Sequence, residues 1–355
     1  DKVFITAFDI SHNCRNITYR EFLYMCFPTI SELKKSQENI KVMIIGRASP
    51  ETSALMISTA LVGGCHSVLF EDLSYEAIVS RIEIFKPTHI YINSGVDIEK
   101  INNLSENFPS LFQKTYQDYI LINDSHKEDL LDSSLIYCDE SDVYKSIPKV
   151  SVESLNYLFC LFTSGSTGKP KAIWHSYAGY LVYAAYSFKE YFTNAGAVDS
   201  IFCATDAAWI NGHTYAVYGP LMKDTRTIFM QDLSNLQRPD ILSIFLNITQ
   251  PQFLYSSVTL LRAIRSYSIL LGSSCIQNQS YKIIGLGSCG EPLAHDVGSW
   301  ALDYFNSVNK YIVNTYFQTE TGGVLVAPRS QDSLIKDHST VGKSQFPLEI
   351  SISKN

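Results

Sequence analysis

The run Thr163-Ser164-Gly165-Ser166-Thr167-Gly168-Lys169-Pro170-Lys171 follows directly on residues 157–162, an apolar stretch that predicts a buried strand. Glycines let backbone N–H groups approach a ligand closely, hydroxyls donate further hydrogen bonds, and lysine adds positive charge. This combination predicts a loop that binds a polyphosphate. It is not a Walker A loop, because Thr163 stands where that motif has Gly and Pro170 follows Lys169. The alternative is a plain Ser/Gly surface turn, which so long a run directly after a strand disfavours.

Upstream of this loop the chain alternates between strand-like and helix-like segments. Strands are expected at 40–45, 67–70 and 89–92, and helices at 50–63 and 74–85. Alternation at this spacing is typical of βαβ units, whose strands form a parallel sheet.

The same alternation continues downstream, with a helix from about Ala178. Further strands are expected at 227–230, 253–255 and 282–284. Residues 124–149 are polar, acidic and weakly patterned, so we expect them to connect two lobes. The sequence therefore predicts an α/β protein with mostly parallel sheets, a first lobe over residues 1–150 and a second over 151–355. Ligands of such folds bind at the C-terminal ends of the strands.

The composition excludes several classes of partner. The 355 residues carry a formal net charge of −7, with 46% hydrophobic and 18% charged residues, so no nucleic-acid partner is expected, because binding one needs concentrated Lys and Arg. No apolar stretch approaches the roughly 20 residues that span a bilayer, so no membrane partner is expected. The eight cysteines form no Cys-x-x-Cys pair, and several lie in apolar runs. Reduced thiols pack there as small hydrophobes, which favours a cytoplasmic setting.

The phosphate loop resembles the signature loop of the adenylate-forming superfamily, which includes acyl- and acetyl-CoA synthetases, luciferases and peptide-synthetase adenylation domains. Ala172 stands where the family usually has its last Gly. Residues 175–185, 209–215 and 218–220 resemble the acetyl-CoA synthetase branch in particular. The resemblance implies that the loop binds the β- and γ-phosphates of ATP. Its binding residues are then Thr163, Ser164, Gly165, Ser166, Thr167, Gly168 and Lys169.

A second run, Gly285-Leu286-Gly287-Ser288-Cys289-Gly290-Glu291-Pro292, matches the dinucleotide fingerprint G-x-G-x-x-G, with Asp303 downstream. Against a dinucleotide oxidoreductase, the run lies late in the chain, and a helix is expected to start at Glu291-Pro292, immediately behind the last glycine. In the resembled family, Gly290, Glu291 and Pro292 correspond to the turn that packs against the adenine of ATP or AMP. We therefore expect an adenine-binding turn here.

A third run, Asn314-Thr315-Tyr316-Phe317-Gln318-Thr319-Glu320-Thr321-Gly322-Gly323, follows the apolar residues 311–313, a predicted strand. One carboxylate among hydroxyls suits Mg²⁺, which takes one or two carboxylates plus phosphate oxygens and water. By resemblance, Glu320 is the magnesium ligand and Thr319 donates to the α-phosphate. The residues that line the nucleotide are then Asn314, Thr315, Tyr316, Phe317 and Gln318. The alternative is a strand end whose glutamate points into solvent.

The acyl pocket is assigned by the resemblance alone. Its wall positions correspond to Ile210, Asn211, Cys289 and Phe317, with Trp209 as a possible gate. In acetate-specific relatives a Trp stands where Phe317 stands, so this chain leaves somewhat more room. One methylene in such a pocket is worth only about 1–3 kcal/mol. Acetate is therefore expected first and propionate second.

The resemblance implies that a carboxylate attacks the α-phosphorus of ATP, giving an acyl-adenylate, and that the acyl group then passes to coenzyme A. The expected catalytic residues are Lys169, Thr319 and Glu320, which would position the phosphates and neutralise their charge with the help of Mg²⁺.

Two features depart from the family. The chain stops at Asn355, before the family's ribose-binding Asp and small C-terminal lid, so we expect little turnover from this part alone. Glu71-Asp72 replace a glycine pair, and residues 95–99 carry no Arg, so coenzyme phosphates would be repelled. A catalytically silent nucleotide-binding module is therefore the alternative to an enzyme.

Overall fold

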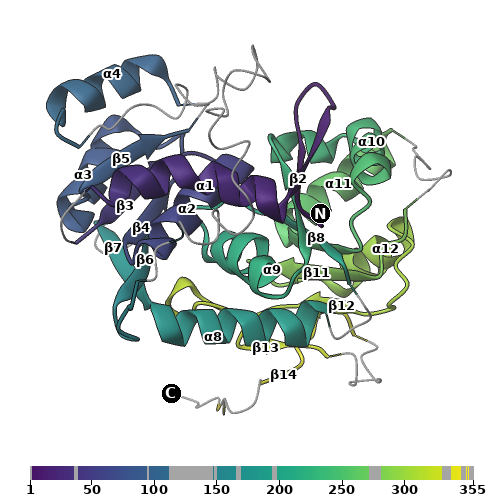
Figure 1. Ribbon diagram of the computed structural model, residues 1–355. Helices are drawn as coiled ribbons and strands as arrows, with labels where there is room; N and C mark the ends of the chain where they lie inside the picture. Colours follow the sequence, from purple (N-terminus) through teal and green to yellow (C-terminus); the bar gives the residue numbers. More distant parts are fainter. Residues whose placement is uncertain are drawn as a thin grey trace. The chain divides into compact units, whose positions relative to one another are not determined.

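The computed structural model describes residues 2–35, 39–93, 96–111, 147, 150–164, 169–193, 198–271, 281–329, 337–344, 349 and 351. The chain divides into two compact units (Figure 1). Unit 1 comprises Asp1–Phe22, Ala48–Pro50 and Tyr180–Asn355, and unit 2 comprises Leu23–Arg47 and Glu51–Gly179. Each unit is described below by itself. Within the expected connector at 124–149, only residue 147 is among the described residues.

Unit 2 is built on a five-stranded sheet with the order β5-β3-β4-β6-β7. Its strands are β3 (Lys41–Ile45), β4 (Cys65–Leu69), β5 (His89–Ile92), β6 (Tyr157–Ser164) and β7 (Pro170–Ser176). All neighbours are parallel except β6 and β7, which form an antiparallel pair. Since β6 and β7 join this sheet, unit 2 extends to Gly179, whereas the sequence placed the boundary between lobes at residue 150.

The helices of unit 2 precede, connect or follow its parallel strands. They are α1 (Tyr19–Leu33), whose first residues belong to unit 1, α2 (Pro50–Leu61), α3 (Tyr75–Phe85) and α4 (Ile98–Asn107). In α3, Ile78, Ile82 and Phe85 recur at helical spacing and pack in one core cluster with Met43 and Ile45 of β3. The helix starts at Ser74, whose hydroxyl accepts the Ala77 N–H at 3.2 Å. The strands and helices predicted for residues 40–92 are thereby confirmed to within a few residues.

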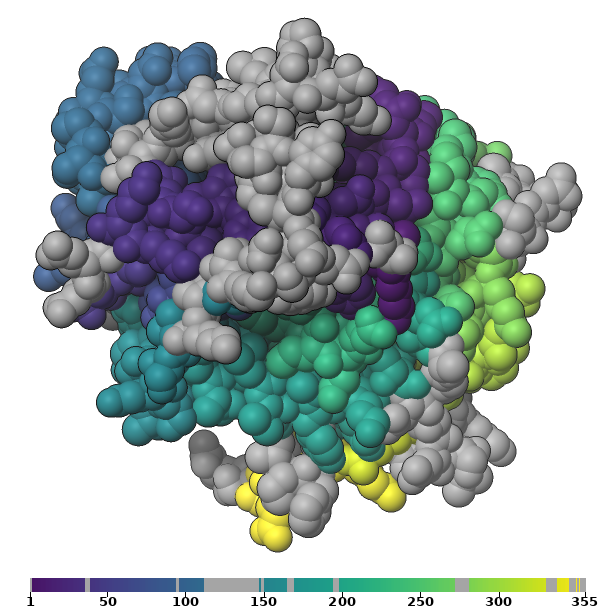
Figure 2. Space-filling view, viewed as in Figure 1, coloured from purple at the N-terminus to yellow at the C-terminus, as the bar shows by residue number. Residues whose placement is uncertain are grey.

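Unit 1 is built on a seven-stranded sheet with the order β12-β11-β10-β8-β9-β1-β2, parallel except at β2. Its strands are β1 (Val3–Phe8), β2 (Cys14–Thr18), β8 (Ser200–Ala204), β9 (Arg226–Met230), β10 (Phe253–Ser257), β11 (Gly285–Cys289) and β12 (Ile312–Asn314). The N-terminal strand β1 pairs with β9, more than two hundred residues later. Accordingly, the purple surface of the N-terminal residues borders green surface in Figure 2.

Helices and short turns cover and connect this sheet. They are α8 (Tyr177–Phe188), η1 (Lys189–Thr193), η2 (Gly212–Tyr218), α9 (Gly219–Met222), η3 (Leu233–Gln237), α10 (Pro239–Thr249), α11 (Val258–Leu270), α12 (His295–Tyr304) and η4 (Thr319–Thr321), with a small hairpin of β13 (Val326–Ala327) and β14 (Lys343–Ser344). Phe245 of α10, Leu261 of α11 and Ala301 of α12 share one buried cluster with Leu254 and Leu286 of the sheet. Apolar residues of three helices therefore cover one face of unit 1.

Two predictions in this unit are wrong. The strand expected at 282–284 begins instead at Gly285, and the helix expected from Glu291 begins at His295. The apolar residues before Gly285 favour a strand by propensity, but the backbone pairing with β10 starts at Gly285, opposite Phe253.

Candidate active site

The carboxyl ends of the parallel strands in unit 1 form the edge at which its candidate site residues gather. Along the chain β9 follows β8 and lies on one side of it, whereas β10, the next strand, lies on the other side. This reversal between β8 and β10 is a topological switch point, where ligands of open α/β sheets bind. Thr205 follows β8, Cys289 ends β11 and Asn314 ends β12, so all three lie at this edge.

Two glycines of the dinucleotide-like run serve packing inside a strand. Gly285 and Gly287 lie in β11 itself. A Cβ at Gly285 would lie 2.6 Å from the Phe253 ring, and one at Gly287 would lie 2.7 Å from the Tyr255 ring. A dinucleotide fingerprint needs its first glycine at the turn after the strand, so the geometry of this run does not form one.

Gly290 begins the turn expected to face adenine. Its φ of +87° is in the left-handed region that favours glycine, and a Cβ there would meet nothing within 4 Å. The next residue, Glu291, accepts hydrogen bonds from the Thr259 hydroxyl and, at 3.0 Å, from Arg262 Nη1, both on α11. Arg262 also donates to the Pro292 carbonyl at 3.3 Å. The exposed turn Gly290–Pro292 is therefore held against α11.

Asn314 and Thr315 fix the end of β12. Asn314 is 2% exposed; its Oδ1 accepts from the Ser288 hydroxyl at 3.1 Å, and its Nδ2 donates to the carbonyls of Ser339 and Thr340 at 3.2 and 3.3 Å. The Thr315 hydroxyl bonds the Tyr255 hydroxyl at 2.7 Å. Asn314 is thus committed to protein partners, which makes it a structural residue of the edge as well as a candidate nucleotide neighbour.

Glu320 lies in η4, a single turn that ends at Gly322 with a φ of +73°. The turn closes on itself, since the Gln318 N–H donates to the Thr321 hydroxyl at 3.1 Å. Thr319 is half-buried and Glu320 is exposed. The carboxylate is therefore presented at the surface of unit 1 on a short, closed turn.

Buried hydroxyls fix the residues that follow Glu320. The Thr214 hydroxyl donates to the Gly322 carbonyl at 2.7 Å, the Val324 N–H donates to the Tyr215 hydroxyl at 2.7 Å, and the Tyr183 hydroxyl donates to the Val324 carbonyl at 2.6 Å. A Cβ at Gly323 would lie 3.0 Å from the Tyr215 oxygen. These contacts of η2 and α8 hold the chain segment that carries Glu320, and sequence reasoning missed them because the partners lie about a hundred residues apart.

Of the residues assigned to the acyl wall, Asn211 contacts Cys289 through its side chain. Its amide oxygen accepts from the Thr205 hydroxyl at 2.9 Å, and its amide nitrogen donates to Cys289 Sγ at 3.5 Å. Burial raises the pKa of the Cys289 thiol to about 11, although its bonds with Tyr255 and Asn211 oppose the rise. Ile210 is buried, whereas Trp209 is 55% exposed. The thiol next to Asn211 is therefore protonated at neutral pH.

Phe317 and its neighbour lie at the same edge of unit 1. The Phe317 ring packs edge-on against Tyr215, with 6.4 Å between ring centroids. Tyr316 pairs through its backbone with Val326, and its side chain is 49% exposed. Gln318 is also exposed.

The phosphate loop joins β6 and β7 of unit 2. Thr163 pairs with Lys171 and Ser164 with Pro170 in the antiparallel ladder, so the two ends of the run are paired strand residues. Lys169 is exposed at the end of this loop. The predicted ligands Gly165, Ser166, Thr167 and Gly168 lie outside the described residues. The strand expected before the run is confirmed, and the binding role of the run stays a prediction.

The segments expected to bind adenine, the rest of the nucleotide and the acyl group thus share one edge of unit 1, whereas Lys169 belongs to unit 2. Among the residues that the structure describes, no group of three or more His, Cys, Asp or Glu is arranged to hold a metal ion. Within the same ranges, no helix combines the length and apolarity needed to cross a bilayer.

A mostly parallel α/β sheet with candidate site residues at its carboxyl edge is typical of nucleotide-binding enzymes. The family model described as AMP-binding enzyme matches residues 1–354, and the chain belongs to this family. The expected adenylate-forming fold, in the form of the large N-terminal domain, is thereby confirmed.

Relatives within the family are acyl-CoA synthetases. Acetyl-coenzyme A synthetase of Vibrio parahaemolyticus is 30% identical over 288 residues, which cover 79% of this chain and 44% of the relative. The same enzyme of Vibrio vulnificus is 28% identical over 351 residues, or 96% and 53% of the two chains. The structure of acetoacetyl-CoA synthetase from Streptomyces lividans matches with a TM-score of 0.76 at 18% identity, covering 93% of this chain and 51% of that one. The chain spans about half the length of the curated relatives it matches.

Proposed function

We propose that this chain binds ATP and a short-chain carboxylate and serves in forming an acyl-adenylate, acetate being the first candidate and propionate the second. The observation that carries the proposal is the shared carboxyl edge of β8, β11 and β12. It brings the turn at Gly290, the end of β12 at Asn314 and the Asn211–Cys289 contact to one switch point. Coenzyme A is the proposed acceptor of the acyl group, as the names of the relatives suggest.

In this proposal each segment contacts a different part of the reactants. Gly290–Pro292 and Asn314–Gln318 contact the nucleotide, while Ile210, Asn211, Cys289 and Phe317 enclose the acyl group. Thr163–Lys169 bind the β- and γ-phosphates, and Thr319 donates a hydrogen bond to the α-phosphate. Lys169 and Glu320 are each proposed to act on ATP.

Glu320 fits a magnesium site in its chemistry. A carboxylate on an exposed turn offers the hard oxygen that Mg²⁺ prefers, and Mg²⁺ commonly combines one or two carboxylates with substrate phosphates and water. When bound, the ion would neutralise charge on the phosphates. The buried hydroxyls of Thr214 and Tyr215 hold the backbone behind this turn in place.

The reaction balances without a redox partner. A carboxylate oxygen forms a bond to the α-phosphorus as the bond from that phosphorus to the leaving pyrophosphate oxygen breaks, and the products are acyl-AMP and pyrophosphate. Residues of the chain bind and align the two reactants, and fixed donors such as Lys169 and Thr319 stabilise negative charge in the transition state. The six described free thiols, Cys14, Cys26, Cys65, Cys160, Cys203 and Cys289, support a reducing compartment such as the cytoplasm.

The test is carboxylate-dependent exchange of pyrophosphate into ATP, measured with the full-length protein. We expect Glu320→Gln to lower the exchange rate by about 10²–10³-fold with the fold intact, because a preorganised charged contact to the phosphates is lost. Lys169→Met is expected to lower it as well. The matched control is Glu106→Gln, which neutralises an exposed carboxylate on α4. Exchange that is unchanged in Glu320→Gln rejects the role of this residue.

A catalytically silent nucleotide-binding module is the second candidate, favoured by the acidic pair Glu71-Asp72. It predicts binding of ATP or an acyl-AMP analogue without any exchange. Binding of NAD in place of ATP would instead support the hypothesis of a dinucleotide oxidoreductase. The position of Gly285 and Gly287 inside a strand argues against that hypothesis.

A further inference from the structure

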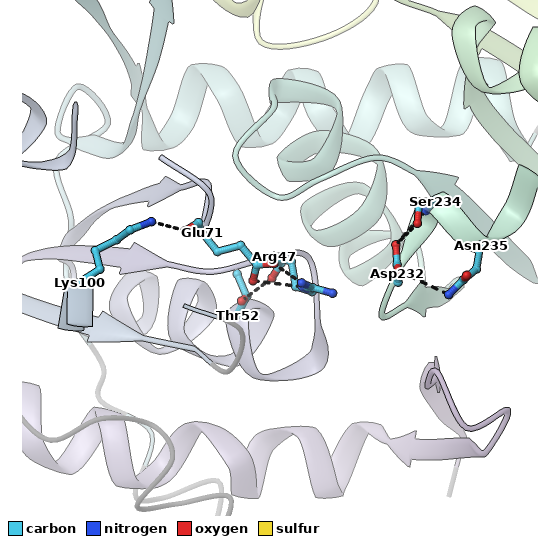
Figure 3. A network of polar contacts seen from close by, with 7 residues as sticks. All are labelled: Arg47, Thr52, Glu71, Lys100, Asp232, Ser234 and Asn235. Atoms are coloured by element: carbon cyan, nitrogen blue, oxygen red, sulfur yellow. Dashed lines mark hydrogen bonds and ion pairs between the residues drawn. The ribbon is translucent and has the colours of Figure 1, made fainter. Parts of the chain in front are cut away.

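The carboxyl edge of the unit 2 sheet carries a polar network made by Arg47, Thr52, Glu71 and Lys100 (Figure 3). Along the chain β4 follows β3 and lies on one side of it, whereas β5 lies on the other side. The reversal between β5 and β3 is a second switch point, the kind of place where parallel sheets bind ligands. Arg47 follows β3 directly, so its guanidinium belongs to this edge.

The backbone that carries Arg47 is fixed by buried side chains. Asn93, which follows β5 and is 3% exposed, donates to the Thr52 hydroxyl at 3.0 Å, and this hydroxyl donates to the Arg47 carbonyl at 2.7 Å. The neighbouring Gly46 N–H donates to the Leu69 carbonyl at 3.0 Å. A Cβ at Gly46 would lie 2.5 Å from Asn93 Cβ, so the two loops are in close contact. Arg47 is therefore held in place without the help of its own side chain.

The guanidinium of Arg47 is occupied by a carboxylate from the next strand end. Its Nε donates to Glu71 Oε2 at 3.1 Å and its Nη2 donates to Glu71 Oε1, which makes a two-point contact. Lys100 Nζ donates to the Glu71 carbonyl at 3.0 Å. A guanidinium binds a phosphate group with the same two-point geometry as a carboxylate. The Arg47 and Glu71 side chains are 33% and 18% exposed, so water reaches the pair.

We propose that Glu71 is an internal anion that occupies Arg47 and excludes phosphate groups from this edge of unit 2. A ligand that enters here carries no phosphate next to Arg47, or it displaces the Glu71 carboxylate first. Since the loops are already fixed by Thr52, Asn93 and Gly46, the ion pair is not needed to join them. The sequence suggested that Glu71 repels coenzyme phosphates as a free charge; the structure pairs it with a cation, and exclusion then acts by competition.

For the acyl acceptor, and resting on the proposed function, the consequence concerns its phosphates. Because Arg47 is occupied, a thiol acceptor that carries phosphate groups is expected to bind this edge no more tightly than the same thiol without them. With coenzyme A as the acceptor, its phosphate groups are therefore expected to lie away from Arg47.

The test measures anion binding and needs no catalysis, so its result is independent of the exchange assay. Inorganic pyrophosphate is titrated calorimetrically into the chain and into Glu71→Gln. We expect affinity to rise about tenfold in Glu71→Gln, because a charge-assisted contact becomes available. The gain is expected to vanish in Glu71→Gln/Arg47→Met, which assigns it to this edge rather than to the phosphate loop. Coenzyme A is expected to follow the same order, and pantetheine to show no change.

Asp72→Asn is the matched control, since it removes the adjacent exposed carboxylate and the same net charge. An equal gain in Asp72→Asn would mean a diffuse charge effect and overturn the proposal, as would no gain in Glu71→Gln. If circular dichroism shows that Glu71→Gln does not fold, Arg47→Met alone is titrated with pyrophosphate in its place. We expect it to leave pyrophosphate affinity unchanged, because Arg47 is already occupied; a weaker affinity contradicts the proposal.

Discussion

At the scale of single residues, Phe317 is the side chain whose size we expect to set acyl-chain length. It is half-buried and forms a T-shaped pair with the Tyr215 ring. The larger indole of Phe317→Trp is expected to reduce kcat/KM for propionate relative to acetate by about 10-fold or more, because one methylene in such a wall is worth about 1–3 kcal/mol. Rates with both acids in the full-length protein measure the ratio. The control is Tyr267→Trp, which changes an exposed aromatic residue on α11. If both variants show the same ratio of kcat/KM for propionate to kcat/KM for acetate, Phe317 is not part of the acyl wall.

Gly287 tests the structural role of the glycine-rich run. In Gly287→Ala the new Cβ would lie 2.7 Å from the Tyr255 ring inside a buried strand. We expect the free energy of unfolding in urea to fall by about 1–3 kcal/mol, as is usual for overpacked cores. Gly179→Ala is the comparison, because its added Cβ meets only the Ser176 hydroxyl, at 3.2 Å, within α8. If Gly287→Ala unfolds with the same free energy as the parent chain, the glycine is needed for the close approach of a ligand and not for packing.

At the scale of elements, η2 supports the turn that carries Glu320. The Tyr215 hydroxyl accepts the Val324 N–H at 2.7 Å and donates to the Ser187 hydroxyl at 3.1 Å. Tyr215→Phe leaves a buried N–H without its partner, which typically costs about 1–3 kcal/mol. We expect this loss in urea unfolding, together with a higher Mg²⁺ concentration for half-maximal exchange and little change in KM for the carboxylate.

Tyr281→Phe is the matched control, since the Tyr281 hydroxyl is buried with no hydrogen-bond partner among the described residues. It is expected to leave stability and the Mg²⁺ requirement near those of the parent chain. If Tyr215→Phe lowers stability but leaves the Mg²⁺ requirement unchanged, Tyr215 supports the fold without positioning Glu320.

The same scale shows which elements local sequence could predict. β3 and β5 are buried on both faces, so their continuous apolar runs gave their positions to within a residue. β11 reads Gly-Leu-Gly-Ser-Cys, which local propensity assigns to a turn. Its strand exists because Gly285 and Gly287 admit the rings of Phe253 and Tyr255 from β10, a tertiary requirement that no local pattern reveals.

At the scale of the whole molecule, motifs indicated candidate site residues but not the contacts that hold them. Glu320 and Gly290 are candidates on short runs alone, because the chemistry that suggests them is local. The Tyr215–Val324 bond spans 109 positions, and Arg47 pairs with Glu71 across 24, so neither follows from spacing. The unit boundary was missed for a related reason: β6 and β7 follow the connector in sequence yet complete the sheet of β3, β4 and β5.

Buried thiols in both units are expected to make the free energy of unfolding depend on pH in the alkaline range. Burial raises the pKa of Cys26 and Cys160 to about 12 and that of Cys289 to about 11, from an ordinary 9.0. Above pH 9 the unfolded chain therefore loses thiol protons that the folded chain keeps, and the free energy of unfolding falls as pH rises. The slope approaches about 1.4 kcal/mol per pH unit for each such thiol between its ordinary and raised pKa.

Urea unfolding between pH 8 and pH 10 measures this slope. Cys26→Ala lowers stability at every pH, because it removes a buried side chain, but it also removes one titrating group. We therefore expect its stability to fall less steeply with pH than that of the parent chain. A slope identical to the parent's would mean that Cys26 titrates alike in the folded and unfolded chains, contrary to its position 0% exposed between α1 and α2, where its Sγ contacts the Ala54 carbonyl at 3.7 Å.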